Sequence, residues 1–266
     1  MEALRKVKHI SELTKQDLEL INIIVFDVDG VLVPRGTRIK STNTELHLQI
    51  KPIAPSIVYK ILMLHNIGYD VNINSGRGLY MLQMIFREIL QWASLTYENG
   101  SATWIGGDIV QHVNSFDTLK YPMYDLLKIQ DPNIKGWEPK EFIITIHCWD
   151  RVPQIEKVVD KYKAGVYWLW NGEAYDIGMR NTQTKANGIN ALMKDVFHMS
   201  KENIMVIGDN YNDKEMMAAG GIAVTADKYR VDGDFWVELE GDKLPGEVMI
   251  DKILELEDAW YEYSGN

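Results

Sequence analysis

"NIIVFDVDGVLV", residues 22–33, places two carboxylates at the end of an apolar run. Residues 22–28 are nearly all apolar before the acids, which is typical of a strand covered on both faces of its sheet. Asp27 and Asp29 lie two positions apart, and Gly30 follows them. Burying a charge is costly unless the charge is paired or bound to a metal. The stretch therefore predicts either a solvated turn or a site that holds a cation.

The composition is typical of a globular protein, and the net charge is negative. The 266 residues are 46% hydrophobic and 25% charged, with a formal net charge of −10. This charge argues against nucleic acid or an anionic membrane as a partner. The single cysteine, Cys148, excludes an intramolecular disulfide framework, and residues 1–20 lack the apolar core of a signal peptide. We expect a cytoplasmic protein, and the sequence leaves its oligomeric state open.

Apolar strands alternate with helices along most of the chain. Strands are predicted at residues 22–28, 69–74 and 203–207, with helices at 54–66 and 184–197. Such alternation favours an α/β fold, in which helices cover both faces of a parallel sheet. We therefore expect a Rossmann-like core of three layers.

Residues 104–180 differ from the rest of the chain. Helices are predicted there at 118–129 and 152–163, and strands at "EFIITIHCW", "GVYWLWN" and "AYDIGMR". The Pro- and Gly-containing stretch 131–139 is predicted to be a loop. We expect an inserted α+β domain at 104–180, acting as a cap over a core formed by residues 1–103 and 181–266. A β-hairpin flap is expected near residues 36–51, where polar and apolar residues partly alternate.

Three of the predicted strands end in polar side chains. The residues concerned are Asp27 and Asp29; Asn74, Ser75 and Arg77; and Asp209, Asn212 and Asp213. In a parallel sheet these groups would meet at the carboxyl edge, where ligands of such sheets bind. Carboxylates suit Mg²⁺, and Ser75 together with Lys185 can hold a phosphate group. Each motif alone has an ordinary explanation, as a turn, a helix cap or a solvated lysine.

Taken in order, the motifs resemble those of the haloacid dehalogenase superfamily of phosphohydrolases. The matching stretches are "DVDGV", "NSGR", "TKANGINAL" and "GDNYND". The stretch "YENGS" and the late insert resemble the Cof-type branch, which carries a C2-type cap after the third strand. The segment before "TKANGINAL" is also similar to archaeal phosphoglycolate phosphatase and to sucrose-phosphate phosphatase.

This resemblance implies roles for particular residues. Asp27 would attack phosphorus to form an aspartyl-phosphate, and Asp29 would act as general acid and then as general base. The implied catalytic residues are Asp27, Asp29, Ser75 and Lys185. The implied metal-site residues are Asp27, Asp29, Asp209 and Asp213, with Asp29 contributing its main-chain carbonyl. The expected substrate-binding residues are Ser75, Gly76, Arg77, Asn99, Arg180, Lys185 and Asn212.

The expected function is that of a Mg²⁺-dependent phosphatase of small phosphate monoesters, with phosphoglycolate or a sugar phosphate as substrate. A phosphotransferase or phosphomutase with the same aspartyl-phosphate is an alternative, and a non-catalytic scaffold protein is another. In the insert, Trp149, Asp150 and Arg151 fall at a strand end and are candidates for substrate contact. His147 is interpreted as a core or surface histidine.

Overall fold

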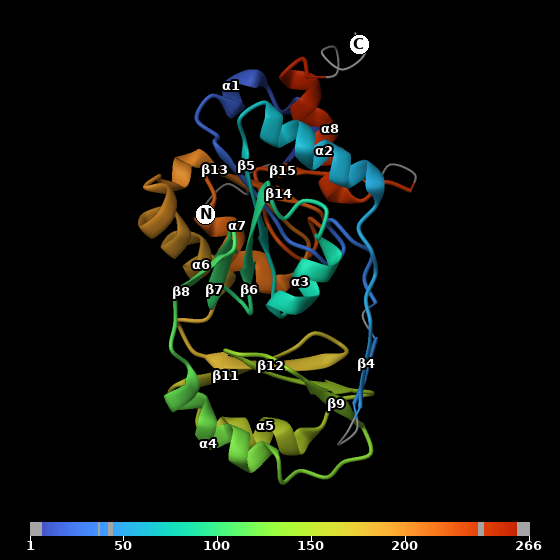
Figure 1. The fold of residues 1–266 in the computed structure, drawn as a ribbon, viewed down its shortest axis with the longest axis vertical. Coiled ribbons are helices and arrows are strands. Elements are labelled where there is room, and N and C mark those ends of the chain that lie inside the picture. The colour runs from blue at the N-terminus through green and yellow to red at the C-terminus, as the bar shows by residue number, and fades with distance from the viewer. Residues whose placement is uncertain (1–6, 37, 42–44, 239–241, 260–266) are drawn as a thin grey trace, which may run out of the picture.

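The computed structural model describes residues 7–36, 38–41, 45–238 and 242–259. These residues form a large sheet of nine strands, a smaller sheet of four and a two-stranded hairpin, and the two larger sheets lie one above the other (Figure 1). No helix within the described ranges is long and apolar enough to cross a membrane.

The large sheet has the strand order β1-β15-β14-β13-β2-β5-β6-β7-β8. From β1 to β6 each strand runs parallel to its neighbour, whereas β7 and β8 form an antiparallel hairpin at the edge. The bounds are β1 Lys8–His9, β2 Ile23–Phe26, β5 Asp70–Asn74, β6 Ala93–Tyr97, β7 Ala102–Ile105, β8 Asp108–Gln111, β13 Ile204–Gly208, β14 Ile222–Thr225 and β15 Phe235–Trp236.

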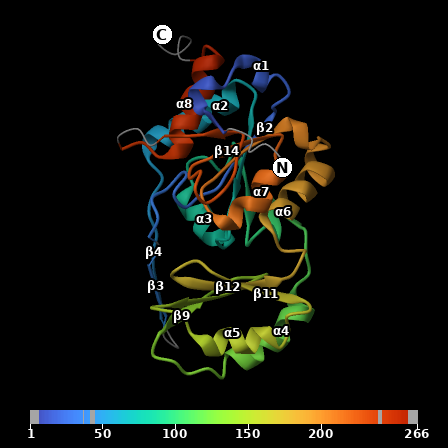
Figure 2. The same ribbon diagram turned by 180° about the vertical axis from the view of Figure 1, so that it is seen from behind.

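Helices cover both faces of this sheet because its central strands are apolar on both sides. In β2, Ile24 and Phe26 pack into one core, and Ile23 and Val25 pack into the other. The first core lies under α2 (Pro55–Asn66), α3 (Leu79–Ile85) and α8 (Pro245–Leu256), and the second lies under α6 (Lys185–Leu192) and α7 (Lys214–Ala219) (Figure 2). The predicted three-layer α/β core is confirmed.

The shorter helical segments complete the core. They are α1 Lys15–Leu18, the 3-10 turns Ile10–Glu12, Lys201–Asn203 and Tyr211–Asp213, and a π-helical turn at Met193–Phe197 that continues α6.

The smaller sheet is antiparallel throughout, in the order β11-β12-β10-β9. Helices α4 and α5 pack on its outer face, and its other face looks toward the large sheet (Figure 1). The bounds are α4 Phe116–Leu126, β9 Ile134–Glu138, β10 Ile144–Cys148, α5 Pro153–Asp160, β11 Val166–Trp170 and β12 Ala174–Met179. The predicted α+β insert is therefore present as a second layer over the core.

Two details differ from the sequence-based prediction. The loop expected at 131–139 contains β9, because Ile134–Glu138 pairs with β10 in spite of the poor strand pattern "IKGWE". The boundary expected between residues 103 and 104 falls within β7, and β8 pairs with β7 as part of the large sheet. The division into two folding domains stays a prediction.

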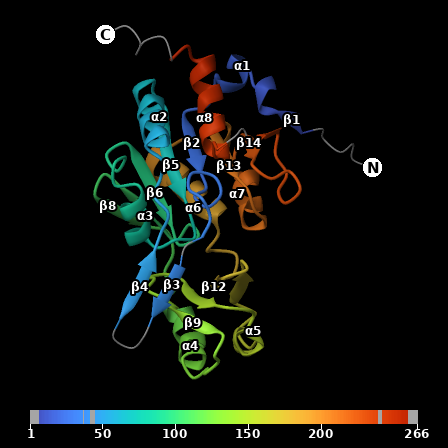
Figure 3. The same cartoon turned by 90° about the vertical axis from the view of Figure 1, so that its right-hand side faces the viewer.

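The flap expected near residues 36–51 is a hairpin of β3 (Arg38–Ser41) and β4 (Leu46–Gln49). Residues 37 and 42–44 of the expected flap lie outside the described residues. The hairpin extends from the core along the edge of the smaller sheet, and β3 lies beside β9 (Figure 3). The flap thus reaches from one layer to the other.

Gly188 lets helix α6 approach β6 and the turn after it closely. A Cβ at this position would lie 2.5 Å from Gly100 Cα and 2.8 Å from Thr96 Cγ2. Because α6 begins with Lys185, this contact also fixes where the lysine enters the core.

We predict that Gly188→Ala lowers the free energy of unfolding by about 1–3 kcal/mol through overpacking, as measured by urea denaturation. Gly165→Ala is the matched control, because the nearest atom to its added Cβ is Thr118 Cγ2 at 3.8 Å. Its stability should change by less than about 1 kcal/mol. Equal losses in both variants would contradict the prediction.

Candidate active site

A buried lysine joins two carboxylates at the carboxyl edge of the large sheet. Lys185 Nζ lies 2.6 Å from Asp27 Oδ1 and 2.6 Å from Asp213 Oδ1. The three residues come from the start of α6, the end of β2 and the turn after β13, and each is at least nine-tenths buried. Thr184 caps α6 through its side chain and so fixes the first turn, to which Lys185 belongs.

The electrostatics of this triad leave an excess of negative charge. Burial and the nearby charge of Asp213 raise the pKa of Asp27 from 3.8 to about 8, although Lys185 opposes the rise. Burial alone would lower the pKa of Lys185, but the two carboxylates outweigh it and raise that pKa above its usual range. The lysine therefore stays charged, while Asp27 lacks full compensation within the protein.

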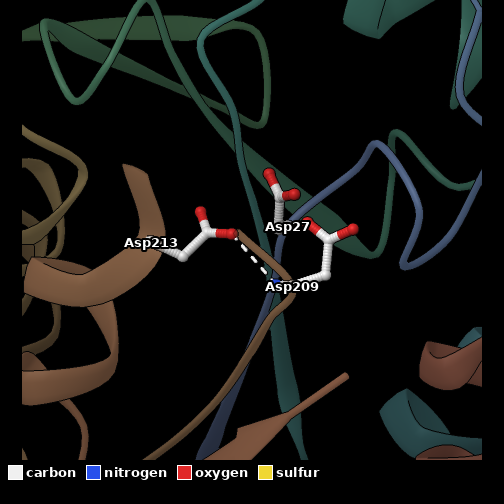
Figure 4. Close-up of side chains that lie close together, drawn as sticks. All are labelled: Asp27, Asp209 and Asp213. Carbon is white, nitrogen blue, oxygen red and sulfur yellow. Dashed lines mark hydrogen bonds between the residues drawn. The ribbon is translucent and has the colours of Figure 1, made fainter. Parts of the chain in front are cut away.

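Asp209 joins the same cluster from the loop after β13. One oxygen from each of Asp27, Asp209 and Asp213 lies within 4.8 Å of the others. Figure 4 shows these three carboxylates converging, with Asp213 turned toward the backbone of Asp209. Asp209 Oδ1 is buried without a hydrogen-bond partner among the described residues, and burial raises the pKa of this carboxyl in spite of a nearby arginine.

This arrangement fits a hard divalent cation. Clustered oxygen ligands with uncompensated charge are what Mg²⁺ requires, and the orphaned oxygen of Asp209 lacks only such a partner. The two oxygens of Asp213 are already occupied, by Lys185 and by the amides of Asp209 and Asn210 at 3.0 and 3.1 Å. Asp27 and Asp209 are therefore better direct ligands, and Asp213 positions the lysine and the loop.

Arg35 was not predicted from the sequence. It precedes the flap, and its Nη2 lies 2.5 Å from Asp209 Oδ2. Burial opposes the charge of Arg35, but Asp209 outweighs this effect and raises the arginine pKa. A lone arginine in the irregular stretch between Gly30 and β3 gives no sequence signal, because its contact with Asp209 spans 174 positions.

The side chain of Asp29 pairs with Arg77. Arg77 Nε and Nη2 donate to the two oxygens of Asp29 at 2.8 and 2.6 Å, a bidentate pair. The Asp29 side chain is 38% exposed, so it reaches the cavity from the rim. Ser75 begins the same loop and accepts a hydrogen bond from the Arg77 amide at 3.2 Å. The expected catalytic groups Asp27, Asp29, Ser75 and Lys185 therefore share one site.

A cavity of about 240 Å³ lies between the two sheets and contains this cluster. From the core it is lined by the predicted residues Asp27, Asp29, Ser75, Gly76, Arg77, Lys185, Asp209 and Asn212, and by Arg35. From the smaller sheet it is lined by residues that the sequence analysis did not single out as ligands, chiefly Glu138, Lys140, Thr145, His147 and Asp176.

Two predicted substrate-binding residues do not line the cavity. Arg180 donates to the carbonyls of Lys163 and Val166 at 3.1 and 3.2 Å, so its guanidinium fastens β11 instead of reaching the site. Asn99 lies behind Gly76, where it donates to the Tyr167 hydroxyl at 3.3 Å.

The strand-end residues of the insert also lie elsewhere. Trp149 is 73% exposed, and Arg151 pairs with Glu156 outside the cavity. Asp150 is exposed as well. His147 lines the cavity and is buried against Glu138, at 2.8 Å, so the interpretation of it as an ordinary core or surface residue missed its place in the site.

Glu98 fastens the smaller sheet to the core. Its buried carboxylate accepts hydrogen bonds from the amides of Glu141, Phe142 and Ile143, at 3.0, 2.6 and 3.1 Å. Burial raises the pKa of Glu98, although these amides oppose the rise. The clamp holds the loop between β9 and β10, which also carries Lys140, at the mouth of the cavity.

Comparison with known proteins identifies the fold. A family model of haloacid dehalogenase-like hydrolases matches residues 117–228. The chain is similar to a phosphatase of this superfamily from Bacteroides thetaiotaomicron, with a TM-score of 0.66 and 17% identity, covering 94% of this chain and 99% of the other. Residues 117–228 thus match this hydrolase family, and the solved structure shows the same fold over most of the chain. No curated protein sequence matches it.

Other solved structures have the same fold at similarly low identity. Trehalose-6-phosphate phosphatase of Aspergillus fumigatus gives a TM-score of 0.61 at 17% identity, covering 95% of this chain and 99% of that one. A protein of Thermoplasma acidophilum gives a TM-score of 0.63 at 19% identity, covering 91% of this chain and 100% of that one. The family match supports a hydrolase of this superfamily, as predicted, and the solved structures show the fold. The particular similarity to phosphoglycolate and sucrose-phosphate phosphatases stays a prediction.

Because the negative charge of Asp27 is buried beside other carboxylates, removing this charge should stabilise the metal-free protein. Because the native pKa is raised from 3.8 to about 8, the native state holds a proton that the unfolded chain has lost. Stability of the metal-free protein should therefore fall as the pH rises through this window. Asp27→Asn should unfold with a free energy higher than wild type by about 1–2 kcal/mol at pH 8, and with a smaller difference at pH 5.

The measurement is urea denaturation in EDTA at both pH values. Asp108→Asn, at an exposed position of β8, is the matched control and should behave as wild type. A wild type that is at least as stable as Asp27→Asn at pH 8 would contradict the claim that the charge of Asp27 destabilises the native state.

Proposed function

We propose that this protein is a Mg²⁺-dependent phosphatase of small phosphate monoesters, with Asp27 as the nucleophile. The observation that carries the proposal is the position of Asp27, whose carboxylate lines the cavity 2.6 Å from a permanently charged lysine. Asp209, with its unpartnered buried oxygen, lies in the same cluster. A nucleophile beside cationic groups in a partly closed cavity is what phosphoryl transfer requires.

In the first step, a carboxylate oxygen of Asp27 attacks phosphorus and the bond from phosphorus to the ester oxygen breaks. Asp29 lies two residues away on the cavity rim, and it would donate a proton to the departing alcohol. This transfer requires Asp29 to take up a proton from solvent and to leave the bidentate contact with Arg77, which frees the guanidinium to bind the phosphoryl oxygens.

In the second step, Asp29 takes a proton from water, and the water oxygen attacks the aspartyl-phosphate. The bond from phosphorus to the Asp27 oxygen breaks, which releases inorganic phosphate and restores the carboxylate. Ser75 and Lys185 would hold the phosphoryl oxygens, and Asp213 keeps the lysine in place. Mg²⁺, held by Asp27 and Asp209, would supply the remaining positive charge for those oxygens.

The two layers would limit the access of bulk water to this chemistry. The Glu98 clamp and the flap beside β9 both hold the smaller sheet over the cavity. A closed site strengthens the electrostatic contacts and protects the covalent intermediate from stray nucleophiles.

Hydrolysis of 4-nitrophenyl phosphate tests the proposal. Wild type should release 4-nitrophenol with Mg²⁺ and should lose this activity in EDTA. Asp27→Asn should lower kcat by a factor of at least about 10³, the scale expected when a nucleophile is removed.

Asp108→Asn is again the matched control, and it should retain wild-type turnover. Asp27→Asn should remain folded, as measured by circular dichroism. Turnover by the folded Asp27→Asn variant equal to wild type would refute the assignment of the nucleophile.

A further inference from the structure

The face of the smaller sheet that looks into the cavity is polar, whereas its other face is apolar. Side chains alternate along a strand, so Thr145 and His147 of β10 share one face while Ile144, Ile146 and Cys148 share the other. The apolar set is buried against α4 and α5. The polar set lines the cavity opposite the catalytic carboxylates.

Strand register extends this polar face across three strands. Thr145 is the direct partner of Glu138 on β9 and of Asp176 on β12. The three side chains therefore lie in one row across the sheet, and all three line the cavity. Thr145 Oγ1 donates to Asp176 Oδ1 at 2.5 Å, which fixes the orientation of that carboxylate.

Lys140 ties this row to the core loop that would hold phosphate. Its Nζ donates to the Gly76 carbonyl at 2.8 Å and lies 3.4 Å from both Glu138 Oε1 and Asp176 Oδ1. Burial alone would lower the pKa of Lys140, but Asp176 and Glu138 outweigh it and raise that pKa. The row is thus placed beside Ser75 and Gly76, where the carbon atoms next to a bound phosphate ester would lie.

The row offers more hydrogen-bond acceptors than donors. Glu138 and Asp176 contribute four carboxylate oxygens, and Glu138 Oε1 receives no hydrogen bond from the described residues. Lys140 is the charged donor of the row, and it is already shared between these two acids. His147 contacts Glu138 at 2.8 Å. Because a hydroxyl group can both donate and accept a hydrogen bond, substrate hydroxyls match such a mixed row.

A substrate carboxylate would fit this row poorly. It could only accept hydrogen bonds, and it would meet two carboxylates whose single nearby lysine is already engaged. Like charges in a partly buried site cost several times more than in water, which disfavours an acidic substrate.

We propose that the row Glu138–Thr145–Asp176, with Lys140, selects phosphate monoesters of polyhydroxylated alcohols or sugars over phosphorylated carboxylic acids. The inference rests on the proposed phosphatase function and names its substrate class. Glu138 and Asp176 accept hydrogen bonds from substrate hydroxyls, and Lys140 holds the two acids in place.

Steady-state kinetics with Mg²⁺ test this selection. The substrates are glucose 6-phosphate, mannitol 1-phosphate, glycerol 3-phosphate, phosphoglycolate and 4-nitrophenyl phosphate. Wild type should show a kcat/KM for at least one polyol ester that is at least about tenfold above that for phosphoglycolate, the scale of one lost charged hydrogen bond.

Asp176→Asn and Glu138→Gln separate recognition from a structural role. Each should lower kcat/KM for the best polyol ester by at least about tenfold, mainly through KM, and should change that for 4-nitrophenyl phosphate by less than about threefold. Asp117→Asn, an exposed position on α4, is the matched control and should change neither. Preference for phosphoglycolate, or equal losses on both kinds of substrate, would overturn the inference.

Binding measurements keep the test independent of turnover. If wild type hydrolyses none of these esters, the phosphatase proposal fails, and the selection between esters is then tested by binding alone. Calorimetric titration of Asp27→Asn with mannitol 1-phosphate and with phosphoglycolate then decides it. Tighter binding of the polyol ester supports the selection, and equal or weaker binding, or none, overturns it.

Discussion

The ammonium group of Lys185, enclosed between the carboxylates of Asp27 and Asp213, is the contact on which the rest of the site depends. Both distances are 2.6 Å, and the lysine side chain is only 3% exposed. Removing the lysine would leave its carboxylate partners buried without a counter-charge, and breaking a buried pair in this way typically costs about 3–5 kcal/mol. The close approach of α6 to β6 at Gly188 brings the lysine to this position, so packing and electrostatics are joined at one helix.

Even with this contact, the carboxylates of the site outnumber the cationic groups that neutralise them. One lysine serves two carboxylates, Asp209 adds a third, and Arg35 at the rim pairs with only one oxygen of that acid. Burial raises the pKa of Asp27 as a result. A site of this kind is destabilising for the free protein and receptive to a cation and to a phosphate, which is a common relation between stability and function.

The part of the site carried by the large sheet could be predicted from the sequence. Apolar strands that end in Asp27, Ser75 and Asp209 meet at one edge because parallel strands share a direction. The short spacing from Asp209 to Asp213 likewise keeps both in one loop. Each motif is recognised from a short stretch of sequence, and the parallel sheet brings the motifs close together.

The part carried by the smaller sheet could not be predicted in the same way. "ITIHC" alternates, so the pairing of Thr145 with His147 on one face was present in the sequence, but no local signal says which face looks at the core. Arg180, which was expected to bind substrate, turns back to β11, because its guanidinium donates to the carbonyls of Lys163 and Val166 there. The contact between Glu98 and residues 141–143 depends on docking of the two layers.

A crystal structure of the protein with Mn²⁺, read by anomalous diffraction, tests the central claim most directly. The account predicts one strong anomalous peak within coordination distance of carboxylate oxygens from both Asp27 and Asp209, with Arg35 released from Asp209 and Lys185 still between Asp27 and Asp213. No peak at this cluster in saturating Mn²⁺, or a peak bound elsewhere with the cluster unchanged, would contradict it.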